Sequence, residues 1–269
     1  ELAYKTAADH FIEGGTNRVI LCTDGDFNVG VSDEGSLVRL VEEKKEKGIF
    51  LTILGVGSGN LQDSRMEAIS NKGDGNYAYI DSIAEARKVL VEEIGGTLVT
   101  VAKDVKIQLE FNPMEVEGFR LIGYENRVMA HRDFRDDTKD AGEIGAGHTV
   151  TALYEVVPKG VGMDTPSVPE SRYQADTQPT DEALSGELLV ARLRYKEPAG
   201  TTGIEMAVPV HRSEIRGFDE ASADLKHAAA VAGFGMLLRG SGHKGDLTYE
   251  GAVELARAGL GPESSSYRL

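Results

Sequence analysis

Arg18–Gly30 reads RVILCTDGDFNVG, and this stretch decides the fold. Its first part, Arg18–Thr23, is a short apolar run with β-branched residues and with turn signals on both sides. Such a run is typical of a strand whose two faces are both buried. Asp24 and Asp26 follow at the point where this strand would leave the sheet. Ligands of open α/β sheets bind at that edge, and hard cations take oxygen ligands, so Asp24 and Asp26 are candidate metal ligands. The alternative is an ordinary Asp-Gly turn.

The first part of the chain alternates between apolar strands and helical patterns. Ile49–Leu54 is a second continuous apolar strand, and Asn76–Ile80 is a third. Ser32 and Asp33 are typical residues for starting a helix, and Ser82–Glu85 has the capping-box pattern of a helix that would run to Ile94. Strands that alternate with helices in this way predict a parallel sheet with right-handed crossovers.

The hydrophobic period changes after Gly96. Val105–Phe111 alternates strictly between apolar and polar residues, as in a strand with one buried face and one wet face. The polar loop Pro158–Ser185 lies among further strand patterns, which together predict an antiparallel, sandwich-like structure. These strands are expected at Phe119–Tyr124, Thr149–Val157, Glu187–Tyr195 and Ile204–Val210, and two helices are expected at Ser222–Arg239 and Thr248–Ala258.

These patterns divide the chain into three predicted parts. Residues 1–98 form an α/β part, residues 99–217 form a β-rich extension, and residues 218–269 form a helical segment. We expect the helical segment to pack on the extension or on the α/β part, since its apolar residues need a buried face.

Composition limits the classes of partner. The chain has 269 residues and a net charge of −15, which argues against nucleic acid or an anionic membrane surface as partner. Cys22 is the single cysteine, so no internal disulfide is possible, and its apolar neighbours predict a buried structural thiol. No apolar run has the length of a membrane span. The chain starts at Glu1 within a helical pattern, so we expect it to be part of a longer protein.

Several segments carry a family resemblance. Asn17–Gly25, with its Thr-Asp-Gly motif, and Ile49–Gly57 are similar to the fourth and fifth strands of a von Willebrand factor type A (VWA) domain. Met66–Ser70 and Gly75–Ile80 resemble the helix and the sixth strand that close its sheet. The likeness extends to bacterial VWA proteins with a C-terminal extension of uncharacterised function, and Ala141–Val150 is its most distinctive segment there.

The resemblance implies a fold and a function. The fold would be the second half of a Rossmann-like VWA sheet without its first strands, followed by an antiparallel β-rich domain with C-terminal helices. The implied function is protein binding or adhesion, assisted in the parent protein by Mg²⁺ or another divalent cation, and cell-envelope anchoring of the parent is compatible with it. Of that metal-ion-dependent adhesion site, only Asp24 matches this sequence, because no Asp-x-Ser-x-Ser loop precedes it. We therefore expect no tightly bound cation at Asp24 in this chain, and Asp26 is the weaker candidate.

Other functions stay open at this point. A haloacid-dehalogenase-like phosphohydrolase would use Asp24 as nucleophile and Asp26 as general acid with Mg²⁺. It also needs a later lysine and a second acidic pair, whereas only Asp81 follows the third strand, so we expect no enzyme activity. A purely structural assembly module is a further alternative. The acidic loop Asp133–Asp140 is a possible Ca²⁺ loop, but two basic residues interrupt it and a solvated hairpin loop is favoured.

The resemblance also predicts an open sheet edge. In a VWA domain the strand that matches Val19–Thr23 lies beside the first strand, which this chain lacks. An unpaired apolar edge is a template for pairing with another chain. We therefore expect self-association through this edge, or pairing with the missing half supplied as a separate chain.

Overall fold

The computed structural model describes residues 1–24, 33–57, 59, 61–124, 127–162 and 178–261. The chain forms two compact units, which are described one at a time. The first unit consists of Glu1–Lys106, Arg135–Thr149 and Arg194–Ile204, and the second consists of Ile107–Phe134, Val150–Leu193 and Glu205–Leu269.

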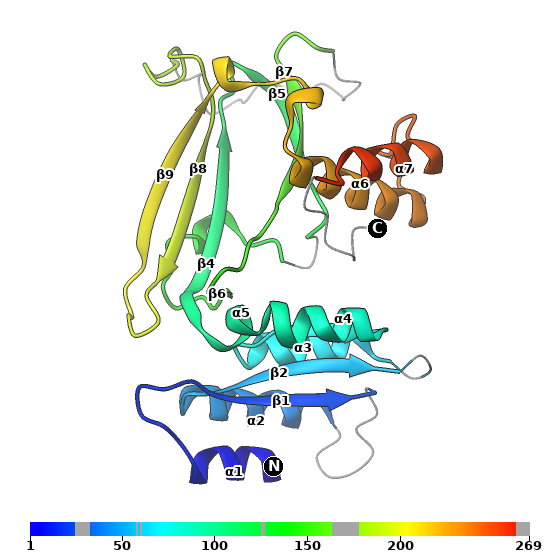
Figure 1. Cartoon of the computed structure of the whole chain (residues 1–269). Helices are drawn as coiled ribbons and strands as arrows, with labels where there is room; N and C mark the ends of the chain where they lie inside the picture. Colours follow the sequence, from blue (N-terminus) through cyan, green and yellow to red (C-terminus); the bar gives the residue numbers. More distant parts are fainter. Residues whose placement is uncertain (25–32, 58, 60, 125–126, 163–177, 262–269) are drawn as a thin grey trace. The chain divides into compact units, whose positions relative to one another are not determined.

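The first unit contains a three-stranded parallel sheet in the order β1-β2-β3. Figure 1 shows β1 and β2 side by side and running in the same direction. In the register of this sheet, Val19 lies beside Leu51, and Ile53 lies beside Tyr77. The predicted alternation of strands and helices is confirmed. Its elements are α1 (Leu2–Asp9), β1 (Asn17–Thr23), α2 (Glu34–Glu46), β2 (Ile49–Val56), α3 (Asp63–Lys72) and β3 (Tyr77–Ile80).

Local chemistry sets the ends of α2, and apolar packing holds it on the sheet. The Asp33 side chain accepts a hydrogen bond from the Ser36 amide at 2.8 Å, as an N-cap residue does, and the other predicted cap, Ser32, lies outside the described residues. Gly48 follows α2 with φ 77°, a conformation that glycine adopts without steric cost. Side chains from α1, α2, α3 and β2 form one core on the sheet. This core contains Tyr4, Val41, Ile49, Leu51, Ile53, Met66 and Ile69.

β1 differs from the prediction because only one of its faces is buried. Val19 and Leu21 pack against the core, but Ile20 is 38% exposed and Cys22 is exposed. The predictions of a strand buried on both faces and of a buried Cys22 are therefore wrong. Within the described residues β1 is an edge strand, and the face that carries Ile20 and Cys22 is not covered, whereas the apolar run alone suggested a strand covered on both faces.

The helix after β3 begins as predicted and then breaks. Ser82 Oγ accepts a hydrogen bond from the Glu85 amide at 3.2 Å, which confirms the cap. The predicted single helix to Ile94 is wrong, because a π-helical turn η1 (Lys88–Glu92) separates α4 (Ile83–Arg87) from α5 (Ile94–Leu98).

The extension is built from antiparallel strands, as predicted. One sheet has the order β6-β4-β8-β9, and a second contains β5 and β7. Phe111 of the first sheet stacks on Phe119 of the second, with ring centroids 4.0 Å apart. The strands are β4 (Thr100–Phe111), β5 (Val116–Ile122), β6 (Gly142–Gly145), β7 (Leu153–Pro158), β8 (Glu187–Lys196) and β9 (Ile204–His211); short 3₁₀ turns are η2 (His131–Asp133), η3 (Arg212–Glu214) and η4 (Phe218–Glu220).

Two capped helices end the described chain. Ser222 caps α6 (Ala223–Leu238), and Thr248 caps α7 (Tyr249–Ala258), each through its side-chain oxygen. Gly233 lets α6 approach Leu247 closely, since a Cβ at this glycine would lie 2.6 Å from Leu247 Cδ2. No helix in the described part is long and apolar enough to cross a membrane. The predicted domain boundaries after residues 98 and 217 stay predictions.

Candidate functional site

Asp24 lies directly after β1, at the carboxyl edge of the parallel sheet, and is exposed. Its neighbour is Gly57, which follows β2: a Cβ built on Gly57 would lie 3.7 Å from Asp24 Cβ. Tyr79 of β3 donates its hydroxyl to the carbonyl of Gly57 at 2.9 Å. The structure thus brings the carboxyl ends of the three strands together around Asp24.

The described residues do not complete a metal site at Asp24. Asp26 lies outside the described residues. In the part of the chain that the structure describes, Asp24 belongs to no group of three or more closely spaced acidic, histidine or cysteine ligands. Mg²⁺ requires about six oxygen ligands in near-octahedral geometry, so one carboxylate does not fit it alone. The cation at Asp24 and Asp26 stays a prediction.

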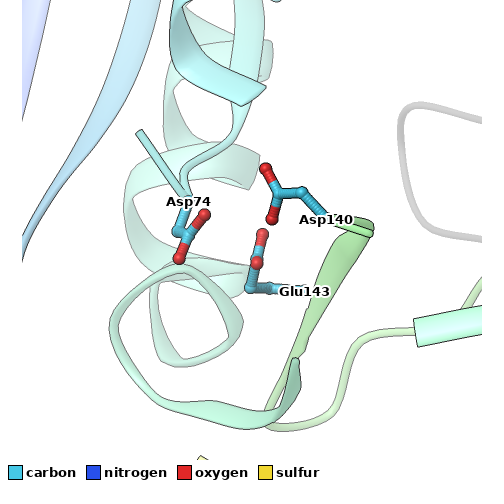
Figure 2. Close-up of side chains that lie close together, drawn as sticks. All are labelled: Asp74, Asp140 and Glu143. Atoms are coloured by element: carbon cyan, nitrogen blue, oxygen red, sulfur yellow. The ribbon is translucent and has the colours of Figure 1, made fainter. Parts of the chain in front are cut away.

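A cluster of three acidic side chains lies elsewhere in the first unit (Figure 2). Carboxylate oxygens of Asp74, Asp140 and Glu143 all lie within 4.8 Å of one another, and we call these residues the carboxylate cluster. Asp74 is in the turn between α3 and β3, Asp140 precedes β6, and Glu143 is in β6. Because the strands of the sheet are parallel, Asp74 lies at the amino edge, opposite the edge that Asp24 occupies.

Glycines fix the turn that carries Asp74. Asp74 adopts φ 46°, which is uncommon for a residue with a side chain. A Cβ at Gly73 would lie 2.7 Å from Val41 Cγ1, and one at Gly75 would lie 1.5 Å from the Leu51 carbonyl oxygen. Neither position accepts a side chain, so the turn packs directly on α2 and β2 and holds Asp74 in place.

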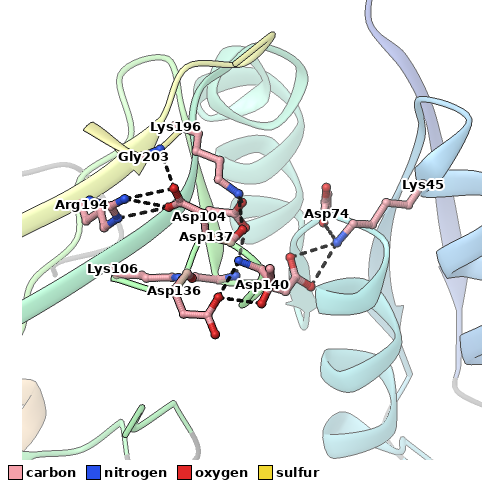
Figure 3. A network of polar contacts seen from close by, with 12 residues as sticks. Lys45, Asp74, Asp104, Lys106, Asp136, Asp137, Asp140, Arg194, Lys196 and Gly203 are labelled. Atoms are coloured by element: carbon pink, nitrogen blue, oxygen red, sulfur yellow. Dashed lines mark hydrogen bonds and ion pairs between the residues drawn. The ribbon is translucent and has the colours of Figure 1, made fainter. Parts of the chain in front are cut away.

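Lys45, from the last turn of α2, inserts into the carboxylate cluster (Figure 3). Its Nζ lies 2.5 Å from Asp74 Oδ1 and 3.1 Å from both carboxylate oxygens of Asp140. The Asp74 contact is an ion pair without the alignment of a directed hydrogen bond. Burial alone would lower the pKa of Lys45, but the contacts with Asp74 and Asp140 outweigh burial and raise it. The charged ammonium group therefore provides the positive charge that a metal ion would bring.

Glu143 is the protonated member of the carboxylate cluster at neutral pH. Burial, and after it the negative charge of Asp74, together raise the pKa of Glu143 to about 8. Burial also raises the pKa of Asp74, against the opposing charge of Lys45. Arg18 of β1 is the other cation whose charge acts on Glu143, and it donates a hydrogen bond to Thr52 Oγ1 at 2.9 Å.

Basic side chains also hold the acidic loop that precedes β6 (Figure 3). Arg194 Nη2 donates to both Asp137 carboxylate oxygens, at 2.9 and 3.1 Å, and the Gly203 amide donates to Oδ2 at 3.2 Å. The hydrogen bond from Arg194 and the one from Gly203 hold the pKa of Asp137 below its usual range. Asp137 is therefore a charged partner of β8.

Two lysines bind the main chain of the same loop. Lys106 Nζ donates to the Asp136 carbonyl at 2.5 Å, and Lys196 Nζ donates to the Asp137 carbonyl at 2.8 Å and to Asp104 Oδ2 at 2.5 Å. Lysine and arginine side chains thus occupy the carbonyl and carboxylate oxygens that a Ca²⁺ ion would use. This arrangement supports the hairpin interpretation of Asp133–Asp140 over the Ca²⁺ loop.

Sequence reasoning missed the carboxylate cluster and its cations. Lys45, Asp74 and Glu143 are far apart in the chain, and no short motif links them. One signal was present in the extension: Arg194 and Lys196 are two residues apart in a strand, so their side chains share one face. Two cations on one strand face predict an acidic partner, but they do not identify it.

The fold defines a class of protein: an α/β unit with a parallel sheet, joined to an antiparallel β-rich extension that ends in helices. Residues 96–269 match the family described as "Uncharacterized protein YfbK, C-terminal", and the chain belongs to this family. It is 39% identical over 268 residues to "Uncharacterized protein YfbK" of Escherichia coli (strain K12). That match covers 100% of this chain and 45% of the relative, so the chain spans less than half the length of the curated relative.

Two solved structures show a weak likeness. The von Willebrand factor type A protein from Catenulispora acidiphila is 15% identical, with a TM-score of 0.35, over 96% of this chain and 57% of that one. The conserved hypothetical protein BatB from Bacteroides thetaiotaomicron is 24% identical, with a TM-score of 0.29, over 34% of this chain and 55% of that one. TM-scores of this size support no conclusion about fold or function.

Proposed function

We propose that this chain belongs to a VWA-type module that binds another protein and catalyses no reaction. The observation that carries the proposal is the position of Asp24 in a Thr-Asp-Gly motif at the exposed carboxyl end of β1. Ligands of parallel α/β sheets bind at this edge, so an exposed carboxylate there is placed to contact a partner.

Asp24 would act as one oxygen ligand of a divalent cation. The cation would supply a positive charge that attracts an acidic side chain of the partner. Gly57, which has φ 97° and no side chain, leaves the space beside Asp24 open. A single carboxylate holds such an ion weakly, so we expect a dissociation constant of about 1 mM or weaker in this chain.

The free edge of β1 would be a second contact surface. β1 pairs with β2 and, within the described residues, lies at the edge of the sheet. Its exposed face carries Ile20 and Cys22, which are apolar residues that another chain can cover. An edge strand of this kind pairs readily with a strand of another chain, including a second copy of this one.

Paramagnetic NMR with Mn²⁺ tests the role of Asp24. Mn²⁺ should broaden the amide signals of Thr23, Asp24 and Gly57 before those of other exposed regions, and Asp24→Asn should abolish this preference. Asp81→Asn is the matched control, since Asp81 is an exposed aspartate that follows β3. Equal broadening in the wild type and in Asp24→Asn contradicts the cation role.

A peptide probe tests the binding step. A short peptide with one glutamate should bind only when Mn²⁺ and Asp24 are both present, because the carboxylate joins the protein through the ion. The same peptide with glutamine in place of glutamate is the control. Binding of both peptides without Mn²⁺ contradicts cation-assisted binding at Asp24.

A further inference from the structure

Most of α6, in the second unit, carries no polar side chain. From residue 228 to residue 238 every residue is alanine, glycine, valine, leucine, methionine or phenylalanine. One side of this helix is packed: Ala230 and Gly233 are buried, and Gly233 lies against Leu247. Figure 1 shows α6 and α7 side by side. A helix that is apolar on every side is normally buried on every side, so the exposed side of α6 requires a partner.

The exposed side of α6 continues onto α7. Val231, Phe234 and Leu238 are three and four residues apart, so they lie on one face of α6. The Phe234 ring meets the Tyr249 ring of α7 edge to face, with centroids 6.2 Å apart, and Val253 lies one turn after Tyr249. Each of these five residues is between 46% and 65% exposed. We call Val231, Phe234, Leu238, Tyr249 and Val253 the apolar hairpin face.

The area of the apolar hairpin face fits a dimer. Five large apolar side chains that are each about half exposed present roughly 500 Å², as much as the largest patch of an ordinary monomer. Two copies that cover each other's face would remove roughly 1,000 Å² from water, which reaches the size of a specific interface before the polar rim is counted.

Charge favours a second copy as the occupant. Residues 223–258, which include α6 and α7, contain four basic and four acidic residues, whereas the whole chain carries −15. Repulsion between two copies is therefore weakest where these neutral hairpins meet, and a strongly charged partner gains no net attraction there. Glu250 and Arg257 are exposed at opposite ends of α7. When two α7 helices cross in opposite directions, Glu250 of one copy approaches Arg257 of the other.

We propose that the apolar hairpin face binds the same face of a second copy of this chain, in a two-fold dimer. Phe234 and Tyr249, which join the two helices, lie at the centre of the contact, and α6 is then packed on both of its apolar sides. Because the same surface is used by both copies, the contact closes at two chains. The proposal does not depend on Asp24 or on the edge of β1, since it involves the second unit alone.

Paramagnetic NMR between copies tests the contact. Cys22→Ser removes the single natural cysteine, and Ala258→Cys then places a spin label at the exposed end of α7, outside the apolar hairpin face. The spin-labelled chain is mixed with an isotope-labelled chain that has no spin label, so that broadening reports contacts between copies. We expect the amide signals of Phe234 and Tyr249 to broaden before those of β1 and β9. Free spin label at the same concentration is the control for non-specific contact.

Substitutions measure the contribution of the apolar hairpin face. The protein concentration at half-maximal broadening gives the dissociation constant of the contact. Phe234→Lys and Leu238→Lys should each raise this constant at least about 10-fold, because a lysine buried without a partner opposes association. Val208→Lys is the matched control and should change it less than about twofold, since Val208 is a half-exposed valine of β9 outside the face.

Three results overturn the proposal. They are absence of broadening up to about 1 mM protein, broadening of α6 and α7 no stronger than that of β1 and β9, and a dissociation constant unchanged by Leu238→Lys. If Phe234→Lys fails to fold because Tyr249 loses its contact, Leu238→Lys carries the test, because Leu238 is the most exposed residue of the face.

Discussion

Lys45 Nζ lies 2.5 Å from Asp74 Oδ1, and this ion pair joins the end of α2 to the turn before β3. The two side chains are only 22% and 13% exposed. Removal of one partner from such a pair leaves a partly buried charge without compensation, which costs more than the loss of an exposed surface pair. The carboxylate cluster is therefore stable only with its lysine.

Lys45→Met should destabilise the chain by about 1–3 kcal/mol, because Asp74 and Asp140 lose the charge that balances them. Urea unfolding at neutral pH measures this loss. Lys47→Met is the control, since Lys47 is exposed and pairs only with Glu43 on the helix surface. Equal effects of the two substitutions would show that the carboxylate cluster has no special dependence on Lys45.

Glu143 should make stability depend on pH. Burial raises its pKa from 4.5 to about 8, so between these values the folded state keeps a proton that the unfolded chain has released. The stability that Glu143 contributes is complete below about pH 4.5 and is lost as pH rises to about 8. The charged groups that act on Glu143 are Lys45, Asp74, Asp140, Asp104 and Arg18. The pKa of Asp74 is also raised, so its contribution to stability falls with rising pH in the same direction.

Glu143→Gln removes this dependence, because glutamine stays neutral at every pH. The difference in free energy of unfolding between the variant and the wild type should be about 1–3 kcal/mol more favourable to the variant at pH 9 than at pH 5. Glu46→Gln is the control on an exposed glutamate of α2. Urea unfolding of the three proteins from pH 5 to pH 9 measures this difference. Parallel curves of unfolding free energy against pH for the wild type and Glu143→Gln would show that Glu143 is not a buried, protonated carboxyl group.

Gly75→Ala should destabilise the chain by about 3 kcal/mol or more. The added Cβ would lie 1.5 Å from the Leu51 carbonyl oxygen, so the turn that carries Asp74 must move away from β2. Gly95→Ala is the matched control, since a Cβ there meets nothing within 4 Å. Thermal unfolding compares the two, and a small effect of Gly75→Ala would mean that the turn does not pack on β2.

The chain should release no phosphate from a generic aryl phosphate in the presence of Mg²⁺. Gly57 follows β2 and has no side chain, and Asp81 follows β3. These two strand ends do not supply the lysine and the acidic pair that a phosphohydrolase needs beside Asp24. Turnover that Asp24→Asn abolishes would establish the enzyme alternative.

The sequence predicted those elements whose signals are local. Ile49–Leu54 is a continuous apolar run and lies within β2, and Asp33 and Ser82 cap helices as expected. Burial of Cys22 was predicted wrongly, because an apolar run reports composition and not whether a strand is central or at an edge. Strand order depends on which segments are neighbours, and periodicity does not contain that information.

The candidate sites likewise differ in whether their residues are contiguous in the sequence. Asp24 was found from sequence because its motif is contiguous with β1. Lys45, Asp74 and Glu143 come together only through the packing of α2, the turn before β3 and β6, so sequence spacing gave no signal of their cluster.

Ile20→Lys tests whether the exposed face of β1 takes part in association. Ile20 is 38% exposed on the edge strand, and a lysine there should weaken pairing with another chain at little cost to folding. Val91→Lys is the control, because Val91 is 63% exposed outside the sheet. Light scattering of both variants measures association, and equal masses for the two would argue against a contact at β1.

The open edge of β1 is the central claim, and hydrogen exchange combined with light scattering tests it most directly. The account predicts a mass that rises with protein concentration, and alternate amides of Val19–Thr23 that exchange quickly in dilute samples and slowly on association. A monomer at high concentration in which every amide of Val19–Thr23 is protected would contradict it, because another part of the chain would then cover the edge.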